Sequence, residues 1–497
     1  MFLSILLLIV ALFVLHSFLT WNFDYWKIRK VPGPNPLPLI GNFSSFVLRN
    51  RPVMSEMNDL YRKYKNAYNF IGVFNYGTPQ ILVTSTRLAR DILTTYFDNF
   101  HDNEFGDITN KRNDQLFSRN PFMLKGREWK RKRAEISPAF TITRIRALYP
   151  HVEDVCSRMT NFVRQNTTLP IETKDLAGKF TTDVVSSCVF AVDAQSFTNK
   201  DALIRSTGRK LLDSSLLFVL KLMCMLMFPK LGKAFRFSFI PKRIERFFIK
   251  LMQEAIHLKE TSSQKCDDFL EYLIKLQEKE SISDIDMAAY GVTFFIDGFE
   301  TSSTAFALTL YELARNPNVQ SILRQELLAS AEKDGSIKFD VLMNLPYLEQ
   351  VLNEGLRLWP PGAFISKKCT KPVSLNLTSD RKITIEAGTC AILCVWSLQR
   401  DPDCFENPDA FDPDRFSAEK GGANIYRENG CYLPFGDGPR KCLGMRFARM
   451  QIKRGIFEVL TNFKISVNSR TKEPLRIVSS PALTLGISGI WLDYVPL

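Results

Sequence analysis

The sequence predicts a chain that is mainly α-helical with small β-sheets (α+β), and its hydrophobic patterns carry this prediction. Residues Gly291 to Leu313 have the pattern of a long, mostly apolar helix, and a second helical pattern covers Met445 to Val459. Residues Tyr68 to Thr84 are rich in β-branched and aromatic side chains on both sides of a Gly-containing turn, which is typical of two short strands. Residues Ile477 to Leu497 have the pattern of a strand hairpin.

The chain divides into three expected segments. Residues 1–21 are almost wholly apolar and approach the ~20 residues that span a bilayer, so we expect a transmembrane anchor. A cleaved signal peptide is the alternative, but the apolar run is long and no A-x-A-like site follows it. Residues 22–40 contain a basic flank followed by a proline-rich hinge. By the positive-inside rule, the basic flank places the residues that follow the anchor on the cytoplasmic side. Residues 41–497 contain no linker, charge block or repeat, so we expect one catalytic domain there.

Charge and cysteine content exclude several classes of protein. The formal net charge of +13 suggests an anionic partner such as phospholipid head groups or an acidic protein. We expect no nucleic acid partner, because no recognition motif accompanies the charge. The ten cysteines contain no C-x-x-C pair, which argues against a zinc site or a secreted disulfide framework.

One stretch, Phe435 to Gly444, presents a single cysteine from a glycine-rich turn just before a helical pattern. Gly436 and Gly438 permit positive φ angles and a close approach of the backbone, while Pro439 stiffens the turn. At the start of a helix the sulfur of Cys442 faces free N–H groups, which favour the thiolate that a metal binds. We therefore expect Cys442 to be the axial ligand of a haem iron; a buried structural cysteine is the alternative.

This stretch resembles the haem-binding signature F-x-x-G-x-R-x-C-x-G of the cytochrome P-450 superfamily. The five defining positions are Phe435, Gly438, Arg440, Cys442 and Gly444. The resemblance implies the cytochrome P-450 fold, with haem between two long helices, these residues and Gly436 around the haem, and Cys442 on its iron. It extends from the anchor to the tail and points to the microsomal type, most like the insect toxin-metabolising branch.

A second motif matches the family's W-x-x-x-R. Trp129 and Arg133 stand four residues apart on an expected helix and so share one face. The resemblance implies that both bind a haem propionate together with Arg440; a solvated basic helix is the alternative. Lys367 stands where an arginine toward a propionate is common, and Gln399 replaces a frequent His. These two departures weaken the expectation of propionate contacts there.

The segment Asp297-Gly298-Phe299-Glu300-Thr301 resembles the family's oxygen-activation motif, [AG]-G-x-[DE]-T. The resemblance implies that Thr301 and Glu300 are catalytic residues that help deliver protons; a Thr301 hydroxyl bonded to its own i−4 carbonyl is the alternative. Asp297 replaces a small residue and shares a helix face with Thr301. A carboxylate in an apolar pocket is costly unless it is paired or protonated. Three roles are open to the Asp297 carboxylate: it would bind a cationic substrate nitrogen, take part in the proton relay, or form a hydrogen bond within its own helix.

A third motif has a structural role. Glu354 and Arg357 lie at i and i+3, as in the family's E-x-x-R, and Pro360-Pro361 ends their helix. The segment Phe411 to Phe416 resembles the one that supplies a second arginine, here Arg415. The resemblance implies a buried network of these three residues that locks the fold behind the cysteine loop.

The resemblance implies a haem-thiolate monooxygenase that inserts one oxygen atom of O2 into apolar small molecules, such as xenobiotics, insecticides or hormone-like lipids. Electrons would come from NADPH through NADPH-cytochrome reductase, with cytochrome b5 as a further candidate partner. The expected location is the endoplasmic reticulum membrane, with the catalytic domain on the cytoplasmic side. Residues Leu216 to Phe228, hydrophobic except for Lys221, are too short to span a bilayer and would touch lipid or pack in the core.

Two other functions are open to this sequence. The first is a reductase-independent haem-thiolate peroxygenase or isomerase, against which the acid–threonine pair Glu300-Thr301 argues, since protonating oxygen matters when dioxygen is activated. The second is a non-catalytic haem- or lipid-binding protein. The substrate itself is not encoded in any motif, because dispersed apolar residues line such pockets.

Overall fold

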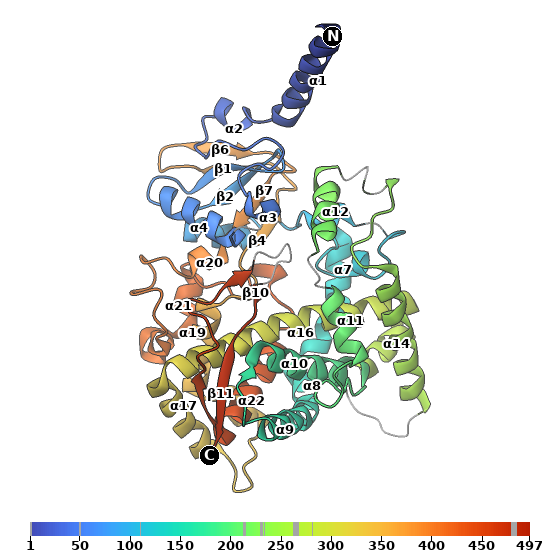
Figure 1. Cartoon of the computed structure of the whole chain (residues 1–497), viewed down its shortest axis with the longest axis vertical. Coiled ribbons are helices and arrows are strands. Elements are labelled where there is room, and N and C mark those ends of the chain that lie inside the picture. Colours follow the sequence, from blue (N-terminus) through green and yellow to red (C-terminus); the bar gives the residue numbers. More distant parts are fainter. Residues whose placement is uncertain are drawn as a thin grey trace.

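The computed structural model describes residues 2–48, 51–109, 111–211, 215–228, 232, 234–261, 268–280, 282–478 and 485–497. Helices make up most of the described chain and the strands form small sheets, which confirms the predicted fold class. The long helix α16 crosses the middle of the molecule, and the largest sheet lies toward the end from which helix α1 projects (Figure 1).

Helix α16 (Asp284–Arg315) is the central element and extends beyond the predicted 291–313 at both ends. It begins where the Ser283 hydroxyl accepts a hydrogen bond from the backbone N–H of Asp286, which satisfies one free donor of the first turn. Most of its side chains are buried, because other helices cover it on several sides. Those helices are α10 (Thr173–Phe190), α14 (Lys242–Thr261), α19 (Pro346–Leu358) and α22 (Met445–Asn462).

The remaining helices surround this centre. Helices α7 and α5 contact the cysteine loop, residues 435–444. Helices α4 and α20 lie beside the largest sheet (Figure 1). The bounds are α1 Phe2–Thr20, α2 Tyr25–Ile28, α3 Ser45–Leu48, α4 Val53–Tyr64, α5 Thr86–Leu93, α6 Phe105–Ile108, α7 Gly126–Ile136, α8 Ile142–Ala147, α9 Tyr149–Gln165, α11 Leu203–Leu211, α12 Leu216–Met227, α15 Phe269–Glu280, α17 Pro317–Ser330, α18 Phe339–Asn344, α20 Val395–Leu398 and α21 Gly422–Glu428.

The largest sheet has the order β1-β2-β7-β4. Strands β1 (Phe70–Asn75) and β2 (Thr78–Val83) form the predicted hairpin, and its turn residues Tyr76 and Gly77 both have positive φ. Strand β7 (Cys390–Leu393) runs parallel to β2, and β4 (Ile365–Lys368) runs antiparallel to β7. Strand β4 thereby brings residues 365–367 to the cavity described below.

Three smaller sheets complete the fold. The C-terminal hairpin is present as β9 with β10, whereas the last strand, β11, pairs with β3 and β8. The bounds are β3 Ile171–Glu172, β5 Val373–Asn376, β6 Lys382–Ile385, β8 Phe463–Val467, β9 Ile477–Val478, β10 Gly486–Ile487 and β11 Trp491–Pro496.

The N-terminal helix α1 projects from the rest of the molecule (Figure 1), and its large apolar side chains, such as Phe2 and Phe13, are exposed. Within the residues that the structure describes, no helix combines the length and hydropathy needed to cross a membrane. The transmembrane span predicted for residues 1–21 is therefore not confirmed. In the proline-rich segment, the carbonyl oxygen of Pro32 accepts a hydrogen bond from the N–H of Gly72 in β1 (2.8 Å).

Candidate active site

The cysteine loop, residues 435–444, holds Cys442 just before helix α22. The backbone N–H of Cys442 donates to the carbonyl oxygen of Phe435 (2.8 Å), which closes the loop. Gly436 and Gly438 have φ angles of +66° and +69°, as the turn prediction required. A Cβ atom at Gly438 would lie 1.9 Å from the carbonyl oxygen of Leu93, at the end of α5. Only glycine therefore lets the loop pack against α5.

Cys442 opens into a cavity of about 460 Å³. Its side chain is accessible, and residues of the cysteine loop, α7, α16 and β4 enclose the same space. The predicted site residues that line this cavity are Trp129, Arg133, Asp297, Thr301, Phe435, Gly436, Arg440, Cys442 and Gly444; Gly298 and Lys367 line it as well. Residues from four separate parts of the sequence thus meet at one site.

The environment of the Cys442 thiol departs from the prediction. Although the thiol is open to the cavity, the surrounding protein desolvates it and raises its pKa to about 11. A backbone N–H bond from Gly444 lowers this pKa, the charge of Asp297 raises it further, and the Arg133 guanidinium lowers it. The backbone N–H at the helix end lowers the pKa of the thiol, as predicted, but burial raises this pKa by more. Thiolate formation here therefore depends on the charge of a bound metal.

One edge of the cavity is cationic. The Arg440 guanidinium lies over the Trp129 ring, 4.1 Å from its centroid, and its Nη2 donates to Oδ1 of Asp102 (3.0 Å). Arg133 shares a face of α7 with Trp129, as predicted, and its Nη2 donates to the carbonyl oxygen of Lys441 (2.7 Å). The indole and the two guanidinium groups thus gather beside Cys442.

The electrostatics of this edge fit a haem. Burial lowers the pKa of Arg440 to about 10, and its Nε is buried with no hydrogen-bond partner among the described residues. Burial and the neighbouring Arg440 charge lower the pKa of Lys367 to about 7. Buried cations short of anionic partners are costly, and carboxylates such as haem propionates would compensate them. Lys367 therefore places an amino group on this edge, at the position where the sequence made a propionate contact doubtful, and an anionic partner would favour its charged form.

Helix α16 brings Thr301 and Asp297 to the cavity but not Glu300. The Thr301 hydroxyl donates to the carbonyl oxygen of Asp297 (2.5 Å), which is the alternative left open by the sequence. Glu300 accepts a hydrogen bond from Nζ of Lys174 on α10 (2.9 Å), which also donates to the Ser303 hydroxyl (2.7 Å). No pattern in the sequence indicates this lysine partner, and the proton-delivery roles of Thr301 and Glu300 stay predictions.

The carboxylate of Asp297 faces the cavity from the middle of α16. Its side chain is accessible, yet the surrounding protein raises its pKa to about 7, with burial as the cause. Thr301 bonds to its backbone carbonyl and not to its carboxylate. Across the described residues no hydrogen bond or ion pair reaches this carboxylate, so the structure does not support an Asp297 that satisfies itself within the helix.

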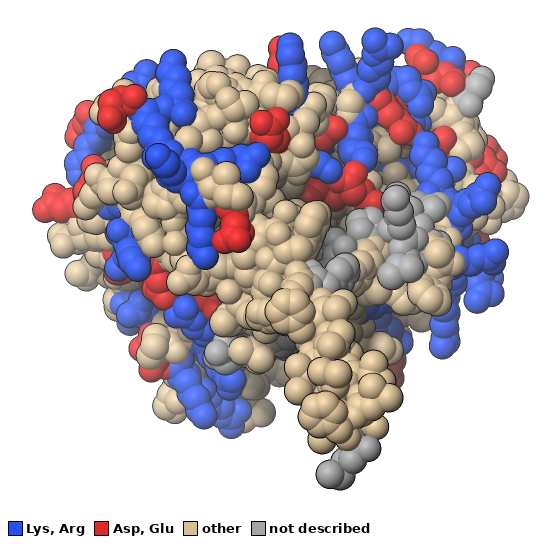
Figure 2. Space-filling view, turned by 90° about the horizontal axis from the view of Figure 1, so that it is seen from above, with Lys and Arg blue, Asp and Glu red and all other residues tan. Residues whose placement is uncertain are grey.

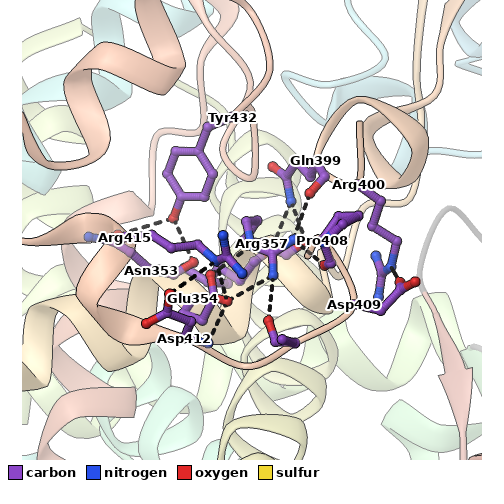
Figure 3. Close-up of polar contacts among 12 residues, drawn as sticks. Asn353, Glu354, Arg357, Gln399, Arg400, Pro408, Asp409, Asp412, Arg415 and Tyr432 are labelled. Carbon is purple, nitrogen blue, oxygen red and sulfur yellow. Dashed lines mark hydrogen bonds and ion pairs between the residues drawn. The ribbon is translucent and has the colours of Figure 1, made fainter. Parts of the chain in front are cut away.

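Glu354, Arg357 and Arg415 form the predicted buried network (Figure 3). Arg357 donates from Nε to Oε2 of Glu354 (2.6 Å) and from Nη2 to Oε1 (2.8 Å), while Nε of Arg415 donates to Oε1 (3.4 Å). The N–H of Asp412 also donates to Oε1 (2.9 Å). The carbonyl oxygens that accept from Arg357 belong to Gln399, Pro408 and Ala410.

Gln399 links this network to the cysteine loop, a role that the sequence did not suggest. Its Nε2 donates to the carbonyl oxygens of Leu356 and Arg357 (both 2.9 Å), and its Oε1 accepts from the N–H of Leu433 (2.9 Å). Leu433 lies two residues before Phe435. Gln399 is fully buried and is not part of the cavity lining. The one signal in the sequence is its place directly before Arg400, where it replaces a frequent histidine.

Comparisons with known proteins agree with this geometry. The family model described as "Cytochrome P450" matches residues 31–491. The chain is similar to "Probable cytochrome P450 28a5" of Drosophila melanogaster, with 36% identity over 99% of this chain and 98% of that protein. It is 34% identical to "Cytochrome P450 6a2" of the same species over 99% of both chains. It is also similar to "Cytochrome P450 6k1" of Blattella germanica, with 30% identity over 98% of this chain and 96% of that protein.

The contact between Gly438 and Leu93 can be tested by adding one methyl group. Gly438→Ala should lower the free energy of unfolding by more than about 2 kcal/mol, because overpacking against backbone adds to the cost of a positive φ. Gly335→Ala is the matched control, since Gly335 also has a positive φ but a Cβ there would meet nothing within 4 Å. Equal losses in urea unfolding would contradict a steric requirement at Gly438.

The buried network should be intolerant of a missing member. Arg357→Ala leaves Glu354 charged and buried, so we expect a loss of about 3–5 kcal/mol in unfolding free energy. Lys250→Ala removes one partner of the exposed Lys250–Glu254 pair and should change it by no more than about 0.5 kcal/mol. A similar small effect for both variants, measured by urea unfolding, would show that the network does not stabilise the fold.

Proposed function

The chain belongs to the cytochrome P450 family and is a haem-thiolate monooxygenase; from this premise we propose that it oxidises apolar small molecules with electrons from NADPH, delivered by a partner reductase. The observation that carries the proposal is the cavity in which the Cys442 thiol, the cationic edge of α7 and the α16 segment meet. We also propose that the protein is attached to the endoplasmic reticulum membrane, with its catalytic domain on the cytoplasmic side.

Different residues of the site would have different roles in the reaction. The haem, when bound, supplies the iron at which dioxygen is activated. One oxygen atom enters the substrate and the other leaves as water, which consumes two electrons and two protons. Cys442 would ligate the metal, and Arg133, Arg440 and Lys367 would hold the acidic edge of the macrocycle.

The cavity lining favours apolar substrates, because aromatic side chains from several elements line it. Those aromatic residues are Phe105, Phe122, Phe140, Phe294 and Phe364. Xenobiotics, insecticides and hormone-like lipids share this apolar character. Proton supply would come through Thr301 at the cavity wall and through the Glu300–Lys174 pair behind it.

A basic surface near Cys442 supports an acidic electron donor. Lys130 and Arg131 are exposed on α7, and Lys441 and Arg446 are exposed beside Cys442. The formal net charge of +13 adds long-range attraction to an acidic protein. NADPH-cytochrome reductase and cytochrome b5 are the partners that we propose for this surface.

Two apolar elements at one end of the molecule support membrane attachment. Helix α1 exposes large apolar side chains, among them Phe2, Phe13 and Val14. Helix α12 exposes Leu217 (77%) and Leu220 (49%) at the same end (Figure 1). Viewed from that end, Lys and Arg lie along the left, upper and right margins, and the area toward the lower middle is mostly uncharged (Figure 2). Apolar contact together with basic residues suits an anionic lipid surface.

Turnover with defined components tests the enzymatic proposal. The purified holoprotein with NADPH, a purified reductase and a test lipid should consume NADPH and form a product that carries one oxygen atom from O2. Consumption should stop without the reductase. Product formation from peroxide alone would point to a peroxygenase, and haem or lipid binding with no product would point to a non-catalytic protein.

Cys442→His is the control for the metal ligand. The reduced wild-type protein with carbon monoxide should show the absorbance typical of thiolate-bound haem, because sulfur donates more electron density to iron than imidazole does. The variant should lose that band. A wild-type spectrum typical of histidine-ligated haem would remove Cys442 from the site.

Membrane attachment through α12 can be measured in a chain that lacks residues 2–20. This truncated protein should still bind vesicles of phosphatidylcholine and phosphatidylserine, and replacing Leu217 and Leu220 by serine should reduce the bound fraction several-fold, since about 25 cal/mol is lost per Å² of apolar contact. Ile322→Ser with Leu328→Ser on α17, similarly exposed, is the matched control. Equal binding by both double variants in a sedimentation assay would argue against α12 as a lipid contact.

A further inference from the structure

Helix α16 exposes one acidic side chain, Asp297, to an otherwise apolar part of the cavity. Its neighbours on the cavity wall from the same helix are Thr293, Phe294, Gly298, Thr301, Ser302 and Ala305. None of these neighbours carries a charge. The hydroxyls of Thr293 and Thr301 donate to backbone carbonyl oxygens, and the Ser302 hydroxyl accepts from Nε2 of Gln451. The carboxylate is therefore the strongest polar group on this wall.

The cations that line the cavity do not compensate Asp297. Arg133 donates to the carbonyl oxygen of Lys441, and Arg440 pairs with Asp102. The charges that shift the pKa of Lys367 are those of Arg440 and Asp102, and the charge that shifts the pKa of Arg133 is that of Cys442. The pKa of Asp297 is raised by burial, with no cation lowering it. The basic groups thus gather at the cationic edge and leave this carboxylate without an ion-pair partner.

An uncompensated carboxylate in an apolar cavity has a definite chemical preference. Its ionisation is disfavoured there, as the pKa of about 7 shows. A ligand that brings a positive charge close to the carboxylate removes this penalty, and attraction is strong where water is excluded. A neutral ligand of the same shape gains nothing from the carboxylate. The surrounding aromatic side chains suit the apolar part of either ligand and can also contact a cation.

We propose that Asp297 makes this cavity selective for substrates that carry a basic nitrogen on an apolar skeleton, with the cationic nitrogen held at the wall of α16. This specificity rests on the proposed monooxygenase function and narrows its substrate class from apolar molecules in general to amphipathic amines. It assigns Asp297 to substrate recognition and leaves proton delivery to Thr301 and the Glu300–Lys174 pair.

A pair of ligands that differ only in charge tests the proposal. The cation is 4-phenylbutyltrimethylammonium, and its neutral isostere is (5,5-dimethylhexyl)benzene, in which carbon replaces nitrogen. The quaternary nitrogen has no lone pair, so it cannot bind iron, and its charge does not vary with pH. Equilibrium dialysis of the full-length holoprotein gives both dissociation constants without any turnover.

Substitutions at Asp297 should change only the affinity for the cation. Asp297→Asn keeps the shape but removes the charge, and it should weaken cation binding about 10- to 100-fold, the scale of losing a charge-assisted contact. Binding of the neutral isostere should stay within about twofold. Asp297→Ala, with the best helix-forming residue, serves as a second neutral variant if the Asn variant does not load haem. Asp297→Glu should keep the preference for the cation.

Asp284→Asn is the matched control, because Asp284 is exposed on the same helix and does not line the cavity. It should leave both dissociation constants unchanged. Equal cation affinity in the wild type and in both neutral variants would overturn the proposal. If those variants bind both ligands normally but convert NADPH consumption into peroxide, Asp297 belongs to proton delivery, which also overturns it. Failure of the monooxygenase function itself would appear separately, as a missing thiolate band with carbon monoxide.

Discussion

The fully buried carboxylate of Glu354 is the constraint on which the site depends. A charge without solvent must be matched by donors, and Glu354 receives them from two arginines and a backbone N–H. Arg357 then extends the network to the carbonyl oxygen of Gln399, whose side chain bonds to Leu433 at the entrance of the cysteine loop. A change in this network is therefore transmitted to the loop that holds Cys442.

The same loop is fixed from its other side by steric contact. Gly438 packs against the carbonyl oxygen of Leu93, so α5 sets the position of the turn, and Arg440 is held by Asp102 and by the face of Trp129. The loop thus sits between a polar network behind it and helices in front of it. This rigidity prepares the thiol for a metal, although burial alone would keep the thiol protonated.

The sequence predicted the local features of the site and missed most of its long-range partners. Gly436 and Gly438, the shared face of Trp129 and Arg133, and the pairing of Glu354 with Arg357 all follow from spacing within one element. The partners Asp102 and Lys174 and the linking role of Gln399 lie on other elements, and no local pattern marks them. The ends of α16 and the shift of β11 to another sheet likewise depend on tertiary packing.

The position of Asp297 illustrates why the structure was needed to interpret a departure from a motif. In the sequence, an acidic residue four positions before Thr301 is consistent with two roles. Its carboxylate could form a hydrogen bond within the helix, or it could face a bound ligand. The structure separates these two cases, because Thr301 takes the backbone carbonyl and leaves the carboxylate facing the cavity. A residue that is both costly to bury and unpaired contributes nothing to the stability of α16. The proposed recognition of a cationic ligand would account for its place in this wall.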